Sequence, residues 1–200
     1  MKLLLRLCAE FVVLCPDSPV KHAITADSAI MNPSQYILAL RSQQTLQIFN
    51  IAEKMKLKSF NMGDPVVYWR WLTPTLMGIV TTKAVFHWDT SNASDPVKMY
   101  DRLKELENHQ IISYRADASL KWFCLVGLAQ ENGRVAGWTQ LYSADKNVAQ
   151  PLRGQAATFA RYTPPGSNQE LTLFCFAHRT ARESKLIIRE VNRTNATPES

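Results

Sequence analysis

The amino-acid sequence predicts an all-β protein built from repeated antiparallel sheets of four strands. Short runs of aromatic and β-branched residues recur along the chain, turn residues separate them, and helical apolar spacing is nearly absent. The first runs of successive repeats begin 38, 45 and 46 residues apart, close to the length of one blade of a β-propeller. We therefore predict a partial β-propeller of about four blades.

Each repeat contains three runs that we interpret as strands. The first runs lie at 28–33, 66–72, 111–117 and 157–163. The second, more apolar runs lie at 36–41, 76–81, 122–128 and 172–179. The third runs lie at 45–51, 84–89, 139–144 and 185–191. Because a unit of this kind cannot bury its faces alone, neighbouring repeats are expected to pack against one another and to form the core.

A fourth, weaker run follows in three of the repeats and is interpreted as an outer strand. These runs lie at 57–62, 96–102 and 148–154. Outer strands form the edge of a sheet, where weak hydrophobicity and a proline such as Pro96 or Pro151 are tolerated. Residues 97–107 also have some helical spacing, so a short helix or a loop turn stays open there.

The connections between the second and third strands differ in length. The gaps at 42–44 and 82–83 are short enough for hairpin turns. The segment 129–138 contains Gly133 and Gly137 and predicts a longer loop. The repeats are therefore expected to share their strands and to differ in their loops.

Composition and charge indicate an ordinary globular protein. The chain has 200 residues, of which 46% are hydrophobic and 20% charged, enough for one sizeable domain. Its net charge of +6 is spread along the sequence, and the basic residues do not cluster on a recognisable nucleic-acid module. No stretch of 18 apolar residues occurs, so no membrane-spanning helix and no membrane insertion are predicted.

The N-terminal segment permits two interpretations. Its first 15 residues, MKLLLRLCAEFVVLC, have the basic start and apolar stretch of a signal peptide. Arg6 and Glu10 interrupt that stretch, and no clean cleavage site follows. We favour residues 1–18 as a divergent remnant of an earlier blade, followed by propeller blades over 19–191. The polar residues 192–200 are expected to be a frayed tail.

No catalytic constellation is present in the sequence. The sequence contains no P-loop, GxSxG, HExxH or GxGxxG motif. Four isolated histidines are expected to have structural roles: His22, His87, His109 and His178. Four cysteines without metal-ligand spacing are expected to be reduced thiols: Cys8, Cys15, Cys124 and Cys175. We predict a protein that is not an enzyme and has no metal or cofactor.

The third run of the first repeat suggests a peptide site. Period-two alternation places Thr45, Gln47, Phe49 and Ile51 on one face of a strand. A groove between two blades has apolar walls and backbone edges, in which an extended peptide can lie with alternate side chains in pockets. The alternative is that these positions pack between neighbouring blades.

Three lysines follow this run at every second position. Lys54, Lys56 and Lys58 are expected to project from one face of an extended strand, beside Phe49 and Ile51. That combination favours a ligand with bulky apolar residues next to Asp or Glu. The alternative is a solvated basic edge that discourages pairing between sheets.

Longer strings within the repeats are specific enough to indicate a family. ITADSAIMNP is followed in order by ILAL, TLQIFNI, WRW, VFHW, PVKMYDR, QIISYR, KW, QLYSADK, AATFA and TLFCFA. These strings closely resemble the amino-terminal domain of the clathrin heavy chain, from about residue 19 to residue 191. The resemblance implies blades of a seven-bladed propeller on which adaptor and accessory proteins dock through short linear peptides.

The resemblance also implies which residues bind the peptide. Those matching the family's clathrin-box site, between its first two blades, are Thr45, Gln47, Phe49, Lys54 and Lys56. Those matching its apolar wall are Val20, Ile24, Leu38 and Leu40. By this resemblance Thr45 and Gln47 hydrogen-bond the peptide and Phe49 lines a pocket. Lys54 and Lys56 attract the carboxylates of the peptide.

Two further family sites have partial matches. The site for an arrestin-type loop corresponds to Trp122, Leu141, Lys146 and Gln150. The family usually has arginine at position 146, so lysine there loses a bidentate contact. The site at the centre of the top face corresponds to Gln110, Ile112 and Leu128, and its aromatic partner falls in a segment that this chain lacks.

The match covers only part of the family's architecture. The first blade is largely missing or replaced by residues 1–18, and the last three blades, the α-solenoid leg and the trimerising hub have no match. An open arc leaves two uncovered sheet faces, so the chain alone is expected to be marginally stable or to aggregate.

The resemblance implies a coat protein of coated pits and vesicles, on the cytoplasmic face of the plasma membrane and trans-Golgi network. Expected partners are adaptors carrying short acidic, apolar motifs and, within a longer product, other clathrin chains. A generic propeller scaffold and a non-functional truncated relative are the alternatives.

Overall fold

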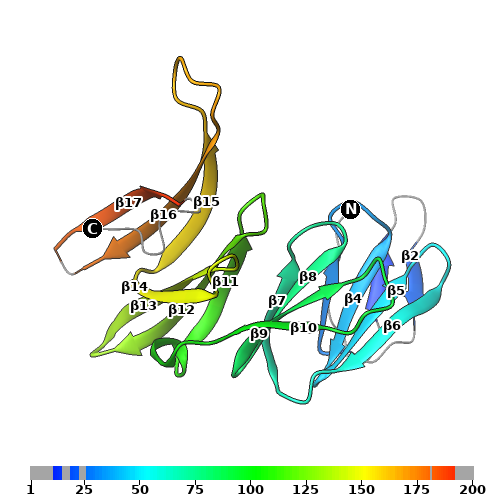
Figure 1. The fold of residues 1–200 in the computed structure, drawn as a ribbon. Coiled ribbons are helices and arrows are strands. Elements are labelled where there is room, and N and C mark those ends of the chain that lie inside the picture. The colour runs from blue at the N-terminus through cyan, green and yellow to red at the C-terminus, as the bar shows by residue number, and fades with distance from the viewer. Residues whose placement is uncertain (1–10, 15–18, 23–25, 181, 192–200) are drawn as a thin grey trace.

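The computed structural model describes residues 11–14, 19–22, 26–180 and 182–191, with side chains from residue 26 onward. Antiparallel sheets follow one another along the chain, and the strand order in each sheet equals the chain order (Figure 1). A two-stranded sheet of β1 (Phe11–Leu14) and β2 (Pro19–His22) comes first. The prediction of an all-β protein is confirmed.

Three sheets of four strands form most of the structure. The first contains β3 (Ser28–Met31), β4 (Ile37–Ser42), β5 (Thr45–Asn50) and β6 (Met55–Asn61). The second contains β7 (Val66–Trp71), β8 (Leu76–Thr81), β9 (Ala84–Asp89) and β10 (Val97–Asp101). The third contains β11 (Gln110–Ala116), β12 (Trp122–Glu131), β13 (Arg134–Ser143) and β14 (Val148–Arg153).

A three-stranded sheet completes the described structure. It contains β15 (Ala156–Tyr162), β16 (Leu171–Arg179) and β17 (Ser184–Glu190). The only helical element among the described residues is a short 3-10 turn, η1 (Lys104–Leu106). The segment 97–107, left open by the sequence, is therefore an outer strand followed by one tight turn. The predicted outer strands of the first three repeats are all present.

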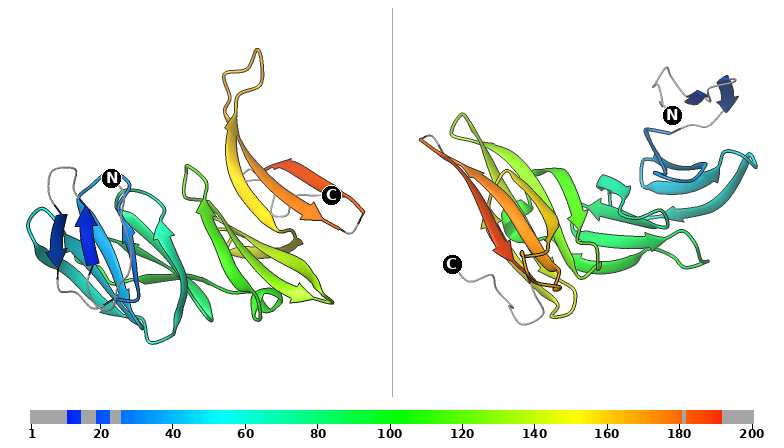
Figure 2. Two further views of the ribbon diagram at one scale, coloured as in Figure 1. Left: turned by 180° about the vertical axis from the view of Figure 1, so that it is seen from behind. Right: turned by 90° about the horizontal axis from the view of Figure 1, so that it is seen from above.

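The first strands of successive sheets converge. Strand β11 contacts both β7 and β15, and the views in Figure 2 show the sheets following one another in an arc. Two side chains of β7 form hydrogen bonds to the first strands of the neighbouring sheets. Trp69 Nε1 donates to Ser28 Oγ on β3 at 3.2 Å, and Arg70 Nη1 donates to the Tyr114 carbonyl on β11 at 3.2 Å. Inner first strands and outer fourth strands are the arrangement of propeller blades.

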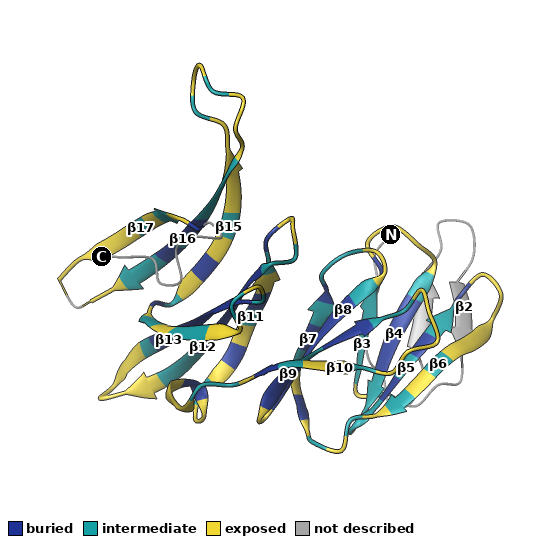
Figure 3. Cartoon of the chain, in the orientation of Figure 1, coloured by how far each residue is buried: buried dark blue, intermediate teal, exposed yellow. Residues whose placement is uncertain are grey.

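The hydrophobic core lies between the sheets, as Figure 3 shows by the buried residues on facing strands. Strand β12 illustrates how one strand serves two interfaces. Phe123 and Leu125 pack against the second sheet, whereas Trp122, Cys124 and Val126 pack against β15 and β16. Because both faces of β12 are covered by other sheets, the sequence of this strand is continuously apolar. Burial also raises the pKa of the Cys124 thiol to about 12, which disfavours the reactive thiolate.

One predicted connection is wrong. The segment 129–138 does not form a long loop, because β12 and β13 continue to Glu131 and Arg134 and pair there directly. Asn132 and Gly133 alone make the turn, with φ of 50° and 74°. A two-residue turn with both φ positive matches the twist of a hairpin, and Asn-Gly is its preferred sequence.

Gly78 on β8 is expected to tolerate no side chain, because a Cβ atom there would lie 2.6 and 2.7 Å from ring carbons of Tyr114. Tyr114 is fully buried, so the ring cannot move into solvent. We expect Gly78→Ala to lower the free energy of unfolding by about 1–3 kcal/mol, measured by urea denaturation. In a Tyr114→Ala background the added methyl should cost much less; an equal cost in both backgrounds would contradict the steric explanation.

Candidate functional site

The residues matched to the first peptide site share one face of the first four-stranded sheet. On β5, Leu46 and Ile48 are fully buried against the second sheet. The alternate residues Thr45, Gln47 and Phe49 are half-buried and point to the other side of the sheet. The structure thus has the alternation that the sequence predicts for this strand.

Cross-strand neighbours extend this face in three rows. The rows are Ser42–Thr45–Asn61, Leu40–Gln47–Ser59 and Leu38–Phe49–Lys56, and we call these nine residues the β5 face. On its β4 side Leu38 and Leu40 are apolar, whereas its β6 side is polar and exposed. The half-buried amide of Gln47 and ring of Phe49 lie between these two sides. A peptide on this face would meet apolar, hydrogen-bonding and cationic groups within one short stretch.

The apolar wall is less accessible than the resemblance implies. Leu38 and Leu40 are only 2% and 1% exposed. They form a small core cluster with Ile51, against which Phe49 also packs. These leucines can hold Phe49 in place but offer almost no surface to a ligand. The side chains of Val20 and Ile24 lie outside the described residues.

The three lysines do not share one face, so that expectation is wrong. Lys56 is the cross-strand partner of Phe49, but Lys58 is the partner of Ile48, on the opposite face. The register shifts between these two pairs, which is a β-bulge, and a bulge breaks the two-residue alternation. Lys54 precedes the strand in a turn with φ of 55°. Both Lys54 and Lys56 are exposed.

Lys58 has a structural role between the first two sheets. Its Nζ donates to the carbonyls of Asp89 at 2.7 Å and Ser94 at 3.1 Å. It also lies 5.5 Å from the centre of the Trp88 ring, a cation–π distance. Burial lowers the pKa of this ammonium group. Sequence reasoning missed this contact, because nothing local in the sequence signals it.

Of the residues matched to the second site, Trp122, Leu141 and Gln150 lie on the face of the third sheet that meets β15 and β16. Leu141 is paired with both Cys124 and Gln150. Trp122 and Leu141 are buried in the core between the two sheets, so a ligand there would have to displace packing. The Oε1 of Gln150 is buried without a hydrogen-bond partner. Lys146 lies half-buried in the turn before β14.

The residues matched to the third site come together at the start of β11. Gln110 and Leu128 are cross-strand partners, and Ile112 lies at the register shift between Ile111 and Ser113. Gln110 and Ile112 are exposed and Leu128 is half-buried. The three residues form a small surface at one end of an inner strand.

The described residues give no sign of a reaction centre. No three of their His, Cys, Asp and Glu side chains form a group that could hold a metal ion. His87 is buried, its Nε2 lies 2.8 Å from Tyr114 Oη, and burial lowers its pKa to about 4. His109 is also mostly buried, 3.8 Å from Glu131. His22 lies outside the residues whose side chains are described.

Among the residues that the structure describes, no helix is long and apolar enough to cross a membrane.

Consecutive antiparallel sheets with converging first strands and cores between them define an open arc of the β-propeller class. The chain is 47% identical over 174 residues to the clathrin heavy chain of Drosophila melanogaster, covering 87% of this chain and 10% of that protein. Clathrin heavy chain 2 of Homo sapiens is 44% identical, covering 90% and 11%. The Dictyostelium discoideum clathrin heavy chain is 42% identical, covering 91% and 11%. The chain therefore belongs to the clathrin heavy-chain family.

The chain spans about a tenth of the length of the curated relatives it matches. No family model matches the sequence. Among solved structures, the mitotic checkpoint complex has a TM-score of 0.46 at 10% identity, covering 90% of this chain and 71% of that one. Hsv2p of Kluyveromyces lactis has a TM-score of 0.42 at 12% identity, covering 94% and 71%. Similarities this weak support no conclusion.

Proposed function

We propose that this chain is a docking module of a clathrin-type vesicle coat, and that the β5 face binds short linear peptides of adaptor and accessory proteins. The observation that carries the proposal is the convergence of Gln47, Phe49 and Lys56 on one sheet face, where Lys56 is exposed and the other two are half-buried. None of these groups is needed for the core between the first two sheets, which uses the opposite face of β5.

Each group has a distinct role in the proposed complex. The amide of Gln47 can both donate to and accept from an extended peptide backbone. The half-buried ring of Phe49 offers an apolar contact that desolvates on binding. Lys54 and Lys56 attract an acidic side chain, mostly by accelerating association and in a salt-dependent manner. The module acts by binding alone and is not an enzyme.

Membership of the clathrin heavy-chain family supports a proposal for the cellular location and the partners of the chain. We propose that the chain works on the cytoplasmic face of coated pits and vesicles, at the plasma membrane and trans-Golgi network. Its partners would be adaptors carrying apolar and acidic motifs and, in a longer product, other clathrin chains. The sites around Trp122 and around Gln110 are secondary candidates, because the first is buried and the second is small.

Fluorescence anisotropy with a labelled peptide of the pattern apolar-x-apolar-acid tests the proposal. We expect Phe49→Ala to weaken binding about tenfold or more, because a half-buried aromatic contact is lost. Gln47→Ala should weaken it about fivefold through the lost hydrogen bonds. Lys56→Ala should remove part of the salt dependence, whereas Lys98→Ala, an exposed lysine on β10, should not.

Circular dichroism of each variant separates lost binding from lost folding. If the folded wild-type chain binds no such peptide, only the interpretation as a general scaffold is left. Equal binding by the wild type and the Gln47→Ala/Phe49→Ala variant would place the site elsewhere.

A further inference from the structure

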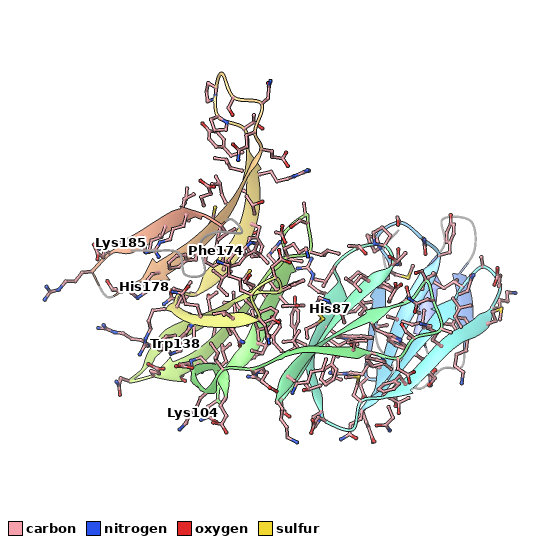
Figure 4. All side chains as sticks on the ribbon, viewed as in Figure 1. His87, Lys104, Trp138, Phe174, His178 and Lys185 are labelled. Carbon is pink, nitrogen blue, oxygen red and sulfur yellow. The ribbon has the colours of Figure 1, made fainter. Side chains whose placement is uncertain are left out.

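A large cavity lies beside the start of β13, and none of the residues matched to the three peptide sites is among its described lining residues. Leu128 of the third matched site is the cross-strand partner of Gly137 in this lining. The third sheet and the three-stranded sheet pack closely through Val126, Leu141 and Phe174, but the β12–β13 hairpin extends beyond β14. Strand β14 pairs with β13 only from Trp138 onward. The cavity, of about 770 Å³, has walls from β13, β14 and β16. Figure 4 labels Trp138 and His178, one on each of the two sheets.

The lining of this cavity is strongly basic. Three arginines from three different strands contribute to it: Arg134 on β13, Arg153 on β14 and Arg179 on β16. Glu131 is the one carboxylate among the described residues of the lining, and His178 adds an imidazole. The guanidinium groups of Arg134 and Arg179 have no ion pair or hydrogen bond with any described residue. Two cations without a side-chain partner in the described part of the chain therefore border one concavity.

Arg153 is held in place beside them. Its guanidinium stacks on the Trp138 ring, 4.3 Å from the ring centre. Glu131 lies 3.5 Å from one of its nitrogens but is half-exposed, so solvent weakens this pair. Stacking covers the flat face of a guanidinium and leaves its edge free to donate hydrogen bonds.

The cavity walls are fixed before any ligand arrives. The Gln155 side chain accepts from the backbone N–H of Arg179 at 2.9 Å and donates to the Arg179 carbonyl at 3.1 Å. Gly137 lies so close to the next segment that a Cβ there would be 2.6 Å from the Gly154 carbonyl oxygen. Binding would therefore cost little ordering of the backbone.

We propose that this cavity binds a compact ligand carrying two or more phosphate groups. Arginine is the side chain best suited to phosphate, because its planar fork donates two parallel hydrogen bonds to two oxygens. The cations come from three strands, so several anionic groups match them better than one. The volume is in the range of small-molecule sites and exceeds the needs of a single phosphate.

Isothermal titration calorimetry of the full chain tests this proposal, with inorganic tripolyphosphate and inositol hexakisphosphate as probes. We expect binding that weakens as salt is raised and that is about tenfold or more weaker in Arg134→Ala/Arg179→Ala. The control Lys54→Ala/Lys56→Ala removes the same charge from a different surface and should bind as the wild type does. Equal weakening in both variants, or no binding by the folded wild type, would overturn the proposal.

Two further experiments identify the source of the phosphate groups and distinguish this cavity from the proposed peptide site on the β5 face. Cosedimentation with phosphoinositide-containing vesicles, lost in the arginine variant, indicates a lipid headgroup; binding of the free probes without cosedimentation indicates a soluble ligand. The Gln47→Ala/Phe49→Ala variant should retain full affinity for the probes. If that variant, correctly folded, also lost the probes, binding at this cavity would be refuted.

Discussion

Replacing Trp88 with alanine is expected to lower the free energy of unfolding by about 3–5 kcal/mol. Trp88 is 1% exposed and lies in the core between the first and second sheets. Its ring contacts Phe60 at a centroid distance of 6.4 Å, and its Nε1 donates to the Ser94 carbonyl at 3.0 Å. The substitution leaves a cavity at an interface that cannot close without moving two sheets.

Urea denaturation followed by circular dichroism measures this effect. A loss of this size is a large part of the stability of a typical domain, so the alanine variant can fail to fold. Trp88→Phe keeps most of the packing and should cost about 1 kcal/mol, mainly from the lost hydrogen bond. If both variants unfolded at the wild-type urea concentration, the first two sheets would not depend on each other as described.

Acidification from pH 7 to pH 4 is expected to destabilise the chain by about 3 kcal/mol through His87 alone. Burial lowers the pKa of His87 from 6.5 to about 4 in the folded state. Between these values the unfolded chain binds a proton that the folded chain does not, so stability falls as the pH falls. The side chain is 8% exposed, with Tyr114 and Phe123 as ring neighbours, and neither offers a negative charge.

Unfolding free energies measured at intervals between pH 7.5 and pH 4 test this expectation. His87→Gln removes the titrating group, so its stability curve should be flatter by about 3 kcal/mol across this window. His109, whose pKa is also lowered by burial, contributes in the same direction, so His109→Gln provides a comparison. A wild-type curve parallel to that of His87→Gln would show that His87 is not buried as a neutral group.

The strands were predictable because each repeat has its own local signal. Runs such as 76–81 and 122–128 are continuously apolar, and the structure shows why: each strand is covered by a sheet on both faces. The long β12–β13 hairpin was not predicted, although Asn132-Gly133 signals it. The glycines at 133 and 137 were assigned to one loop, but Gly137 lies within a strand that crosses close to the chain at Gly154.

The proposed peptide site was predictable only in part. Alternation along β5 correctly separated Gln47 and Phe49 from Ile48, because a strand turns successive side chains to opposite faces. The same rule failed for Lys58, since a β-bulge between the pairs Ile48–Lys58 and Phe49–Lys56 places Lys58 on the opposite face of the sheet from Lys56. Burial of Leu38 and Leu40 depends on elements that pack on β4, which periodicity does not reveal.

The sequence by itself determined the repeat, the strands and the family, because hydrophobic periodicity and matching strings are local along the chain. Only the tertiary structure decided which side chains meet between blades. It brought Lys58 to Trp88 and placed Arg134, Arg153 and Arg179 around one cavity, although 45 residues separate the first of these arginines from the last. Contacts between sheets depend on twist, register and bulges, which accumulate over many residues and leave no short pattern in the sequence.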